Sequence, residues 1–183
     1  MHRVGHDLLV AGDPDLLGLV VVEAALLGVQ RGLDVHVLDL PVDGVKAELV
    51  RDVGASYHSG GVAAAGLQPD VVLECTGVGQ LVFDCLEHTH PNAVVALCGI
   101  SAARAEAETP LTELNRDLVL RNEVVFGTVN AAKRHYGQAA AALAKADNAW
   151  LARLLTKRVP LTSWSDALVR GPDDVKVVIE LQA

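Results

Sequence analysis

In this chain of 183 residues, several residues that could jointly bind a ligand each follow a short apolar run. Glycine lets a ligand approach the backbone closely, a carboxylate accepts hydrogen bonds from hydroxyl groups, and an amide offers both a donor and an acceptor. Such a set of groups suits a dinucleotide, so we take these residues as candidates for cofactor binding. They are Gly12, Asp39, Thr76, Gly77, Gly99, Ile100 and Asn130.

The apolar runs predict the strands that must position these residues. Runs rich in Val and Leu alternate with longer stretches of helical pattern, which indicates an α/β fold with a doubly wound parallel sheet. Right-handed crossovers bring the carboxyl ends of such strands to one edge, where ligands bind at the switch point. The stretch 149–158, "AWLARLLTKR", is predicted to be helical. The expected strands are residues 7–11, 34–40, 56–58, 69–77, 93–101, 123–131 and 175–181.

The loop "GDPDLLG", from Gly12 to Gly18, stands where a nucleotide-binding fold has its G-x-G-x-x-G turn. If Gly12 is the first glycine, Pro14 and Leu17 occupy the places of the other two. Proline has no backbone N–H, and carboxylates at positions 13 and 15 repel a pyrophosphate by about 1 kcal/mol each at ~4 Å. With Asp15 as the predicted N-cap of the helix that follows, we expect cofactor affinity to be weak or absent.

Asp39 and the glycines each have a second interpretation. Asp39 lies at the distance from the first turn that is typical of an acid binding the adenosine ribose, which favours NAD over NADP. The second, less favoured interpretation is a solvated turn residue before Pro41. Gly77 and Gly99 could serve tight turns alone, although two glycines at neighbouring strand ends favour a ligand.

Composition excludes several classes of function. A net charge of −8 without a basic stripe argues against nucleic-acid binding. The longest apolar stretch is too short for a membrane span and the first residues lack a signal core, so we expect a cytoplasmic protein that does not bind membranes. The three cysteines (75, 85 and 98) form no CxxC pair and are expected to be buried reduced thiols, so we predict no zinc site and no other metal site.

The histidines give no clear site either. His88 and His90 do not share a helical face and have no third ligand nearby, so a solvated pair is expected. His135 and Tyr136 could supply an acid or a base, but a surface role is favoured. No catalytic residue can be assigned from the sequence.

Four long segments resemble the C-terminal half of glucose 1-dehydrogenase-like enzymes, which are zinc-type medium-chain dehydrogenase/reductases. They are "HVLDLPVDGVKAELVRDVGASYHS", "VVLECTGVGQLVFDCLE", "NRDLVLRNEVVFGTVNAAKRHY" and "RVPLTSWSDALVRGPDDVKVVIEL". The resemblance implies an NAD(P)-binding Rossmann domain of six parallel strands. It implies that Asp39 meets the ribose, that Thr76, Gly77, Gly99 and Ile100 line the cofactor channel, and that Asn130 lies near the nicotinamide.

The resemblance also implies partners. In this family the strand at 123–128 forms the sheet edge that pairs with its copy, so we expect a homodimer through Glu123–Thr128. The family's catalytic domain, with its zinc ligands, lies N-terminal to the matched region, so a separate chain carrying that domain is a possible partner. We divide the chain into a Rossmann domain, 1–160, and a C-terminal appendage, 161–183. The last strand is expected to pair with another subunit or to fold back onto the main sheet, because unpaired edges are costly.

Three functions follow from these observations. The chain is a dinucleotide-binding domain related to glucose and alcohol dehydrogenases that is not a dehydrogenase by itself. Alternatively, it is a Rossmann module that has lost NAD(P) binding and serves as a structural or partner-binding subunit. A third interpretation is a cofactor-independent enzyme whose candidate groups are Cys75, Cys98, Asn130 and His135.

Overall fold

Continuous apolar runs build the strands of the main sheet. In β1 (Asp7–Ala11), Leu9, Val10 and Ala11 are fully buried, because helices cover both faces of the sheet. The computed structural model describes residues 6–12, 18–101, 111–171 and 173–181. Asp13, Pro14, Asp15 and Leu17, on which the expected loss of cofactor affinity depends, lie outside these residues.

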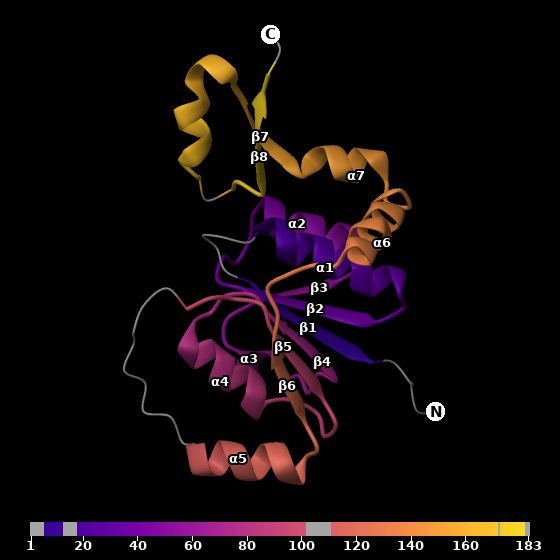
Figure 1. Cartoon of the computed structure of the whole chain (residues 1–183), viewed down its shortest axis with the longest axis vertical. Coiled ribbons are helices and arrows are strands. Elements are labelled where there is room, and N and C mark those ends of the chain that lie inside the picture. The colour runs from indigo at the N-terminus through magenta and orange to yellow at the C-terminus, as the bar shows by residue number, and fades with distance from the viewer. Residues whose placement is uncertain (1–5, 13–17, 102–110, 172, 182–183) are drawn as a thin grey trace.

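The main sheet has six strands, all paired in parallel, in the order β3-β2-β1-β4-β5-β6 (Figure 1). The prediction of a doubly wound, six-stranded parallel sheet is confirmed. The strand order reverses between β1 and β4, which is the switch point where ligands bind in such folds. The other strands are β2 (Asp34–Asp39), β3 (Ser56–Ser59), β4 (Val71–Glu74), β5 (Val94–Leu97) and β6 (Val124–Gly127).

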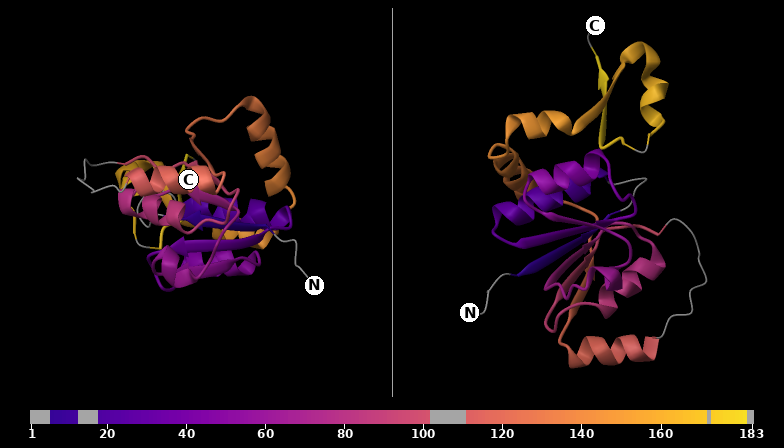
Figure 2. Two further views of the ribbon diagram at one scale, coloured as in Figure 1. Left: turned by 90° about the horizontal axis from the view of Figure 1, so that it is seen from below. Right: turned by 180° about the vertical axis from the view of Figure 1, so that it is seen from behind.

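Two apolar clusters hold the helices against the sheet. One cluster joins β1 and β2 to helices α1, α2 and α7, and the other joins the opposite face to α3 and α4. The helices therefore form layers on both sides of the sheet, as Figures 1 and 2 show. The helix bounds are α1 (Gly18–Gln30), α2 (Val45–Asp52), α3 (Val62–Ala65), α4 (Gly79–Glu87), α5 (Leu111–Leu120), α6 (Lys133–Leu143) and α7 (Asn148–Arg153).

Helix α1 is buried more completely than an ordinary surface helix. Its sequence is apolar apart from Glu23 and Gln30, and Val21, Val22 and Ala25 are fully buried. The Gln30 side-chain amide donates to the carbonyl of Ala142 in α6 at 3.0 Å, and Leu26 and Leu27 lie opposite Ala139 and Leu143, so α6 packs beside α1. This explains why a helix with so few polar residues occurs here.

The C-terminal segment forms a second sheet of two parallel strands, β7 (Leu155–Pro160) and β8 (Lys176–Glu180). The 3₁₀ segment η1 (Leu161–Leu168) connects them. The expectation that the last strand folds back onto the main sheet is therefore wrong, because its partner within the chain is β7. Its pairing with another subunit, the other alternative, stays a prediction. The expected helix at 149–158 is also wrong beyond Arg153, because the strand pairing with β8 determines the conformation from Leu155 onward.

The small sheet is joined to the main one through Val175, which is almost fully buried in the cluster around α1. The division of the chain between residues 160 and 161 stays a prediction, although strand pairing places β7 with β8. Among the described helices, none is long and apolar enough to cross a membrane.

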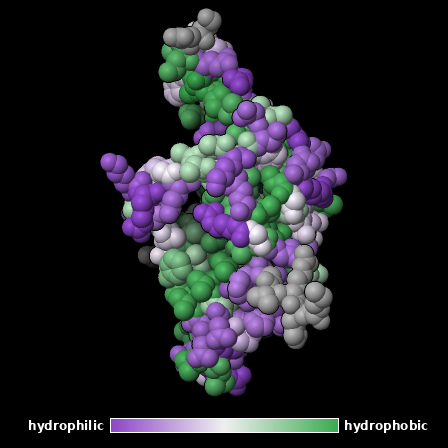
Figure 3. Space-filling view, turned by 90° about the vertical axis from the view of Figure 1, so that its right-hand side faces the viewer, coloured by the Kyte–Doolittle hydropathy of each residue, from purple (hydrophilic) through white to green (hydrophobic). Residues whose placement is uncertain are grey.

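Exposed apolar side chains gather at both ends of the long axis of the molecule (Figure 3). At one end they belong to the edge strand β6 and to α5, a helix with no buried residue. At the other end they belong to the unit formed by β7, η1 and β8. The large exposed side chains of the first group are Leu111, Val119, Leu120, Val124 and Phe126. Those of the second group are Leu161, Trp164, Leu168 and Ile179.

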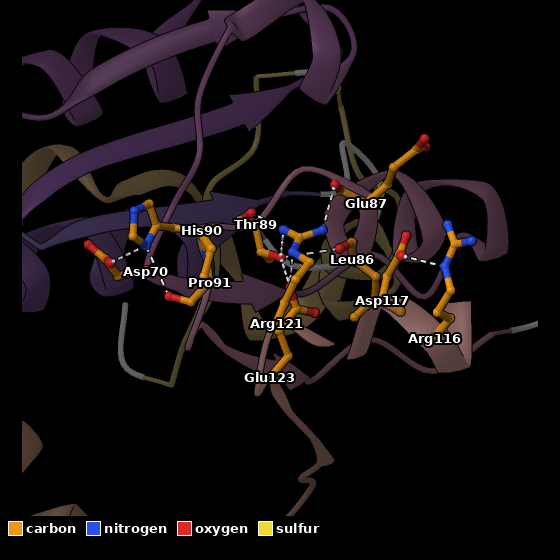
Figure 4. A network of polar contacts seen from close by, with 10 residues as sticks. All are labelled: Asp70, Leu86, Glu87, Thr89, His90, Pro91, Arg116, Asp117, Arg121 and Glu123. Atoms are coloured by element: carbon orange, nitrogen blue, oxygen red, sulfur yellow. Dashed lines mark hydrogen bonds and ion pairs between the residues drawn. The ribbon is translucent and has the colours of Figure 1, made fainter. Parts of the chain in front are cut away.

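The edge strand is held to its neighbours by a polar network in the turns that precede β5 and β6 (Figure 4). Glu123, which precedes β6, accepts a hydrogen bond from the Thr89 hydroxyl at 2.6 Å and forms an ion pair with the Arg121 guanidinium at 2.9 Å. Arg121 also donates to the carbonyl of Thr89. The turn after α5 is thereby fixed to the turn after α4, which positions β6 at the edge.

Candidate functional site

A cleft of about 610 Å³ opens at the carboxyl edge of the main sheet, beside the switch point between β1 and β4. Its volume is within the range of small-molecule sites, roughly 300–1,000 Å³. Three of the predicted cofactor residues, Gly12, Asp39 and Thr76, lie together in its wall. The full lining is Gly12, Leu38, Asp39, Leu40, Gly60, Gly61, Thr76, Val78, Gln80, Leu81 and Asp84.

Glycine backbone forms much of one side of this cleft. Gly12 follows β1, and its N–H donates to the carbonyl of Leu38 at 2.8 Å. A side chain at Gly12 would lie 2.9 Å from Val21 of α1, so this turn needs glycine for the contact between helix and strand. At Gly60 and Gly61 an added Cβ would meet nothing within 4 Å, and Gly60 has a φ of +126°. These two glycines leave space in the cleft that larger residues would occupy.

A buried carboxylate shapes the turn after β4. Glu74 is fully buried, and its carboxylate accepts hydrogen bonds from the backbone N–H of Thr76 at 2.7 Å and of Gly77 at 3.0 Å. The Thr76 hydroxyl also donates to Glu74. A buried charge is costly unless it is hydrogen bonded, so this carboxylate holds the turn in one conformation. Glu74 therefore fixes the position of Thr76 in the cleft.

Gly77 and Gly99 lie against each other. A Cβ on Gly99 would lie 2.1 Å from the backbone nitrogen of Gly77, and one on Gly77 would lie 2.5 Å from the carbonyl carbon of Ile100. Gly77 also has a φ of +69°. The Ser101 hydroxyl donates to the Gly77 carbonyl at 2.6 Å. Both glycines are thus required by contact between the two loops, whatever ligand lies above them.

Asp39 is buried beside a lysine. Its carboxylate accepts from the Nζ of Lys46 at 2.6 Å and from the N–H of Leu40 at 2.8 Å, and its side chain has no exposed surface. Lys46 comes from the first turn of α2. Burial raises the pKa of Tyr57 to about 12, and the nearby charge of Asp39 is the second cause of this rise. Asp39 is therefore neither a solvated turn residue nor an unpaired charge.

The remaining candidate residues are placed differently. Ile100 is exposed, next to Gly99, and Asn130 is exposed in the segment between β6 and α6. Neither belongs to the lining of the cleft. The structure thus brings Gly12, Asp39 and Thr76 into one cavity and places Gly99 against Thr76 and Gly77. The roles assigned to these residues, to Ile100 and to Asn130 stay predictions.

The cysteines are free thiols, as predicted, and Cys75 and Cys85 are buried. Burial is the main reason why the pKa of each of these two thiols rises to about 12. A thiol with so high a pKa is a poor nucleophile and a poor metal ligand. This weakens the interpretation in which Cys75 acts as a catalytic group.

The histidines predicted to be surface residues have structural partners. His88 donates from Nδ1 to the carbonyl of Asp84 at 2.8 Å, and the exposed His90 lies 3.7 Å from Asp70 (Figure 4). His135 is exposed at the start of α6, where its ring accepts from the N–H of Ala132 at 3.1 Å. These contacts agree with the surface roles expected for them.

Sequence reasoning found three of the lining residues and missed the others, and it also missed two residues that support the site from behind its wall, Glu74 and Lys46. Glu74 interrupts an apolar strand, and a charged residue within a buried strand is the signal that could have revealed it. Lys46 lies seven residues beyond Asp39, and only the packing of α2 against β2 shows that the two side chains meet.

Comparison with known proteins gives matches over nearly the whole chain. The family described as "Glucose dehydrogenase C-terminus" matches residues 6–181. Glucose 1-dehydrogenase from Thermoproteus tenax is 36% identical over 178 residues, which cover 96% of this chain and 50% of that protein. Glucose 1-dehydrogenase 2 from Vulcanisaeta moutnovskia is 34% identical over 177 residues, 95% of this chain and 49% of that protein. The chain spans about half the length of these relatives.

Solved structures share the fold. Glucose dehydrogenase from Haloferax mediterranei, in complex with NADP, Zn and gluconolactone, superposes with a TM-score of 0.85 at 22% identity, covering 100% of this chain and 53% of that one. The 2R,3R-butanediol dehydrogenase from Bacillus subtilis gives a TM-score of 0.74 at 20% identity, covering 99% and 52%. At these identities the superpositions establish the fold alone.

Proposed function

Because the chain belongs to the family of glucose dehydrogenase C-terminal domains, we propose that it binds a nicotinamide dinucleotide in the cleft at the carboxyl edge of its main sheet. The observation that carries this proposal is the meeting of Gly12, Asp39 and Thr76 in one cavity at the switch point. Each of them is also a cofactor residue predicted from the sequence. Dinucleotides bind at this place in doubly wound sheets.

The residues present fit such a cofactor. The absence of side chains at Gly12, Gly60 and Gly61 lets a cofactor approach the backbone closely. Glu74 holds the turn at Thr76 in place. The apolar side chains of Leu38, Leu40 and Leu81 give the cleft a surface against which a planar base can pack. A bound nicotinamide would supply hydride transfer, and the chain's own residues would bind and orient the dinucleotide.

We propose NAD as the preferred cofactor, because Asp39 stands at the place of a ribose-binding acid. The preference is weakened by Lys46, which neutralises much of the charge that would repel a 2′-phosphate. The related enzyme from Haloferax mediterranei was solved with NADP. We therefore expect NADH to bind more tightly than NADPH, by a small factor.

This chain spans about half the length of the related glucose 1-dehydrogenases. We propose that the chain does not oxidise glucose or an alcohol by itself and that a second polypeptide supplies the catalytic domain and its zinc. This proposal is supported by the thiols of Cys75 and Cys85, which are buried with raised pKa values and are poorly suited to bind zinc.

We also propose a homodimer formed through the edge strand β6. Val124 and Phe126 are exposed on this strand, and α5 beside it has no buried residue. Pairing of two β6 strands would give hydrogen-bond partners to the backbone N–H and C=O groups at the free edge, and it would cover these side chains. A cytoplasmic location remains part of the proposal, and the three free cysteines agree with a reducing compartment.

The alternative is a module that has lost dinucleotide binding. It depends on Asp13, Pro14 and Asp15, which the structure does not describe, whereas the described cleft favours binding. Calorimetric titration of the full chain with NADH and NADPH distinguishes the two. Saturation near one cofactor per chain supports the proposal, and no heat of binding up to millimolar cofactor would support the alternative.

A further inference from the structure

The lining of the proposed cofactor cleft comes from two parts of the chain. One part follows β2 and β3 and includes Leu40, Gly60 and Gly61, and the other includes Val78 and Leu81 at the start of α4. Helices α3 and α4, which begin beside these two parts, pack on the same face of the main sheet. Leu40 and Val78 are 72% and 53% exposed, so both can contact a ligand. A flat base is the part of a dinucleotide that suits apolar side chains of this kind.

Helix α4 also brings two polar side chains to this cleft. Gln80 lies in its first turn and Asp84 follows four residues later, so the two side chains lie on one side of the helix. Both line the cavity, and Nε2 of Gln80 donates to Oδ1 of Asp84 at 2.8 Å. Asp84 is half-buried and Gln80 is exposed, so a ligand in the cleft can reach the pair.

The two other polar side chains of the lining are bound within the protein. The Asp39 carboxylate accepts from the Nζ of Lys46 and from the N–H of Leu40. The Thr76 hydroxyl donates to the buried carboxylate of Glu74. Direct contact with the polar edge of a base therefore falls to the pair of side chains on α4.

This pair offers an acceptor beside a donor. Oδ2 of Asp84 accepts no hydrogen bond from the described residues, and a glutamine amide has two N–H groups, of which Gln80 uses one in its contact with Asp84. If the amide turned round, its oxygen would face the Asp84 carboxylate and two acceptors would meet. The contact with Asp84 therefore fixes which side of the Gln80 amide faces the cleft.

The order of these groups is complementary to one edge of adenine. The 6-amino group of adenine is a donor and the neighbouring N1 is an acceptor, so Asp84 can accept from the first while Gln80 donates to the second. Hypoxanthine has an oxygen at position 6 and an N–H at position 1, so its oxygen would face a carboxylate and its N–H would face another donor. A site built from hydrogen-bonding groups rejects such a ligand, because its own groups lose their partners.

On the basis of the proposed dinucleotide site, we propose that Gln80 and Asp84 recognise the base and select adenine over 6-oxopurines such as hypoxanthine. Asp39, the proposed ribose-binding residue, lines the same cavity, so base and ribose would be bound by parts of one site. Asp84 supplies the acceptor and also orients the Gln80 amide, so selection depends most on Asp84.

Calorimetric titration of the full chain with NADH and with reduced nicotinamide hypoxanthine dinucleotide tests the proposal, because the two ligands differ at the base alone. We expect the parent to bind NADH about 10- to 100-fold more tightly, which is the discrimination that a matched pair of hydrogen bonds to a base provides. In D84N the new amide can donate to a 6-oxygen and Gln80 can turn its own oxygen towards N1, so the ratio of the two affinities should approach one. E87Q removes a carboxylate from the same helix outside the lining of the cleft, so this matched control should keep the parent's ratio.

The ratio of affinities separates base recognition from a structural role of Asp84. Damage to the cleft would weaken both ligands alike and leave the ratio unchanged, and circular dichroism checks that each variant is folded. Equal affinity of the parent for the two ligands, or the parent's ratio in D84N, would overturn base selection while the dinucleotide site stands. Failure of the parent to bind either ligand would overturn the dinucleotide site, and base selection with it.

Discussion

Both carboxylate oxygens of Glu74 accept a hydrogen bond from the backbone N–H of Gly77, at 3.0 and 3.2 Å. The same carboxylate binds the N–H of Thr76. One buried side chain thus determines the conformation of the turn that carries a wall of the cleft. The site is built on the backbone, and its side chains act mainly by fixing that backbone.

The first prediction concerns this turn. In E74Q the amide oxygen can take the place of Oε1, but the amide NH₂ would then take the place of Oε2, where it would face the Gly77 N–H as a donor against a donor. We expect the free energy of unfolding to fall by about 1–3 kcal/mol and the affinity for NADH to fall with it. Urea denaturation and calorimetry measure the two effects. E87Q, at the exposed end of α4, is the control. Unchanged stability and NADH affinity in E74Q would show that Glu74 does not hold the turn.

The second prediction concerns the contact between the two glycine loops. In G99A the new methyl group would lie 2.1 Å from the backbone nitrogen of Gly77, and neither loop can move without breaking its hydrogen bonds. We expect a loss of about 3 kcal/mol or more in the free energy of unfolding. G137A is the control, because an added Cβ there meets nothing within 4 Å. It should stabilise α6 by about 0.5–1 kcal/mol. Equal stabilities of the two variants would contradict the account.

The third prediction concerns Lys46. In K46M the Asp39 carboxylate would stay buried without its partner, at an expected cost of about 3 kcal/mol. Its charge would also oppose a 2′-phosphate more strongly, so NADPH binding should weaken more than NADH binding. Arg51 lies on the same helix as Lys46 and forms an exposed ion pair with Asp43. R51A removes this pair and should change neither the stability nor the ratio of NADH to NADPH affinity much. A K46M variant with the parent's ratio of NADH to NADPH affinity would refute the assigned role.

The fourth prediction concerns pH. Burial raises the pKa of the Cys75 and Cys85 thiols from a usual value of 9.0 to about 12. The folded state therefore favours the protonated thiols, and the stability that they contribute is complete below pH 9 and is lost between pH 9 and 12. Urea denaturation at pH 8, 9 and 10 should show a falling free energy of unfolding. The fall should be smaller in C85A, and a slope identical to the parent's would contradict this explanation.

The fifth prediction concerns the edge strand. A charge at the exposed Phe126 should prevent two copies of β6 from pairing, so F126E should be monomeric by light scattering where the parent is dimeric. Y136E introduces the same charge at an exposed position of α6 and should stay dimeric. A monomeric parent, or a dimeric F126E, would rule out the proposed interface.

The main sheet could be predicted from the sequence because its strands are nearly continuous apolar runs. Leu8 to Ala11 and Val94 to Leu97 allow no other interpretation once strands and helices alternate. The pairing of β7 with β8 could not be predicted, because Leu155 to Arg158 continues a helical pattern and the partner lies about twenty residues away.

The candidate site was predicted in part for a similar reason. Asp39 and Thr76 could be found because each ends a strand, and strand ends meet at one edge. The Lys46 contact with Asp39 depends on the packing of α2 against β2, which is fixed by the tertiary structure and has no local signal in the sequence.

The central claim is that the cleft at the carboxyl edge binds a nicotinamide dinucleotide. Backbone ¹H–¹⁵N spectra recorded during a titration with NADH test it most directly. The account predicts saturable shifts of the Gly12, Gly61 and Thr76 amides, while amides of α5 and of β7 stay in place. Spectra that do not change up to millimolar NADH, or shifts confined to other elements, would contradict it.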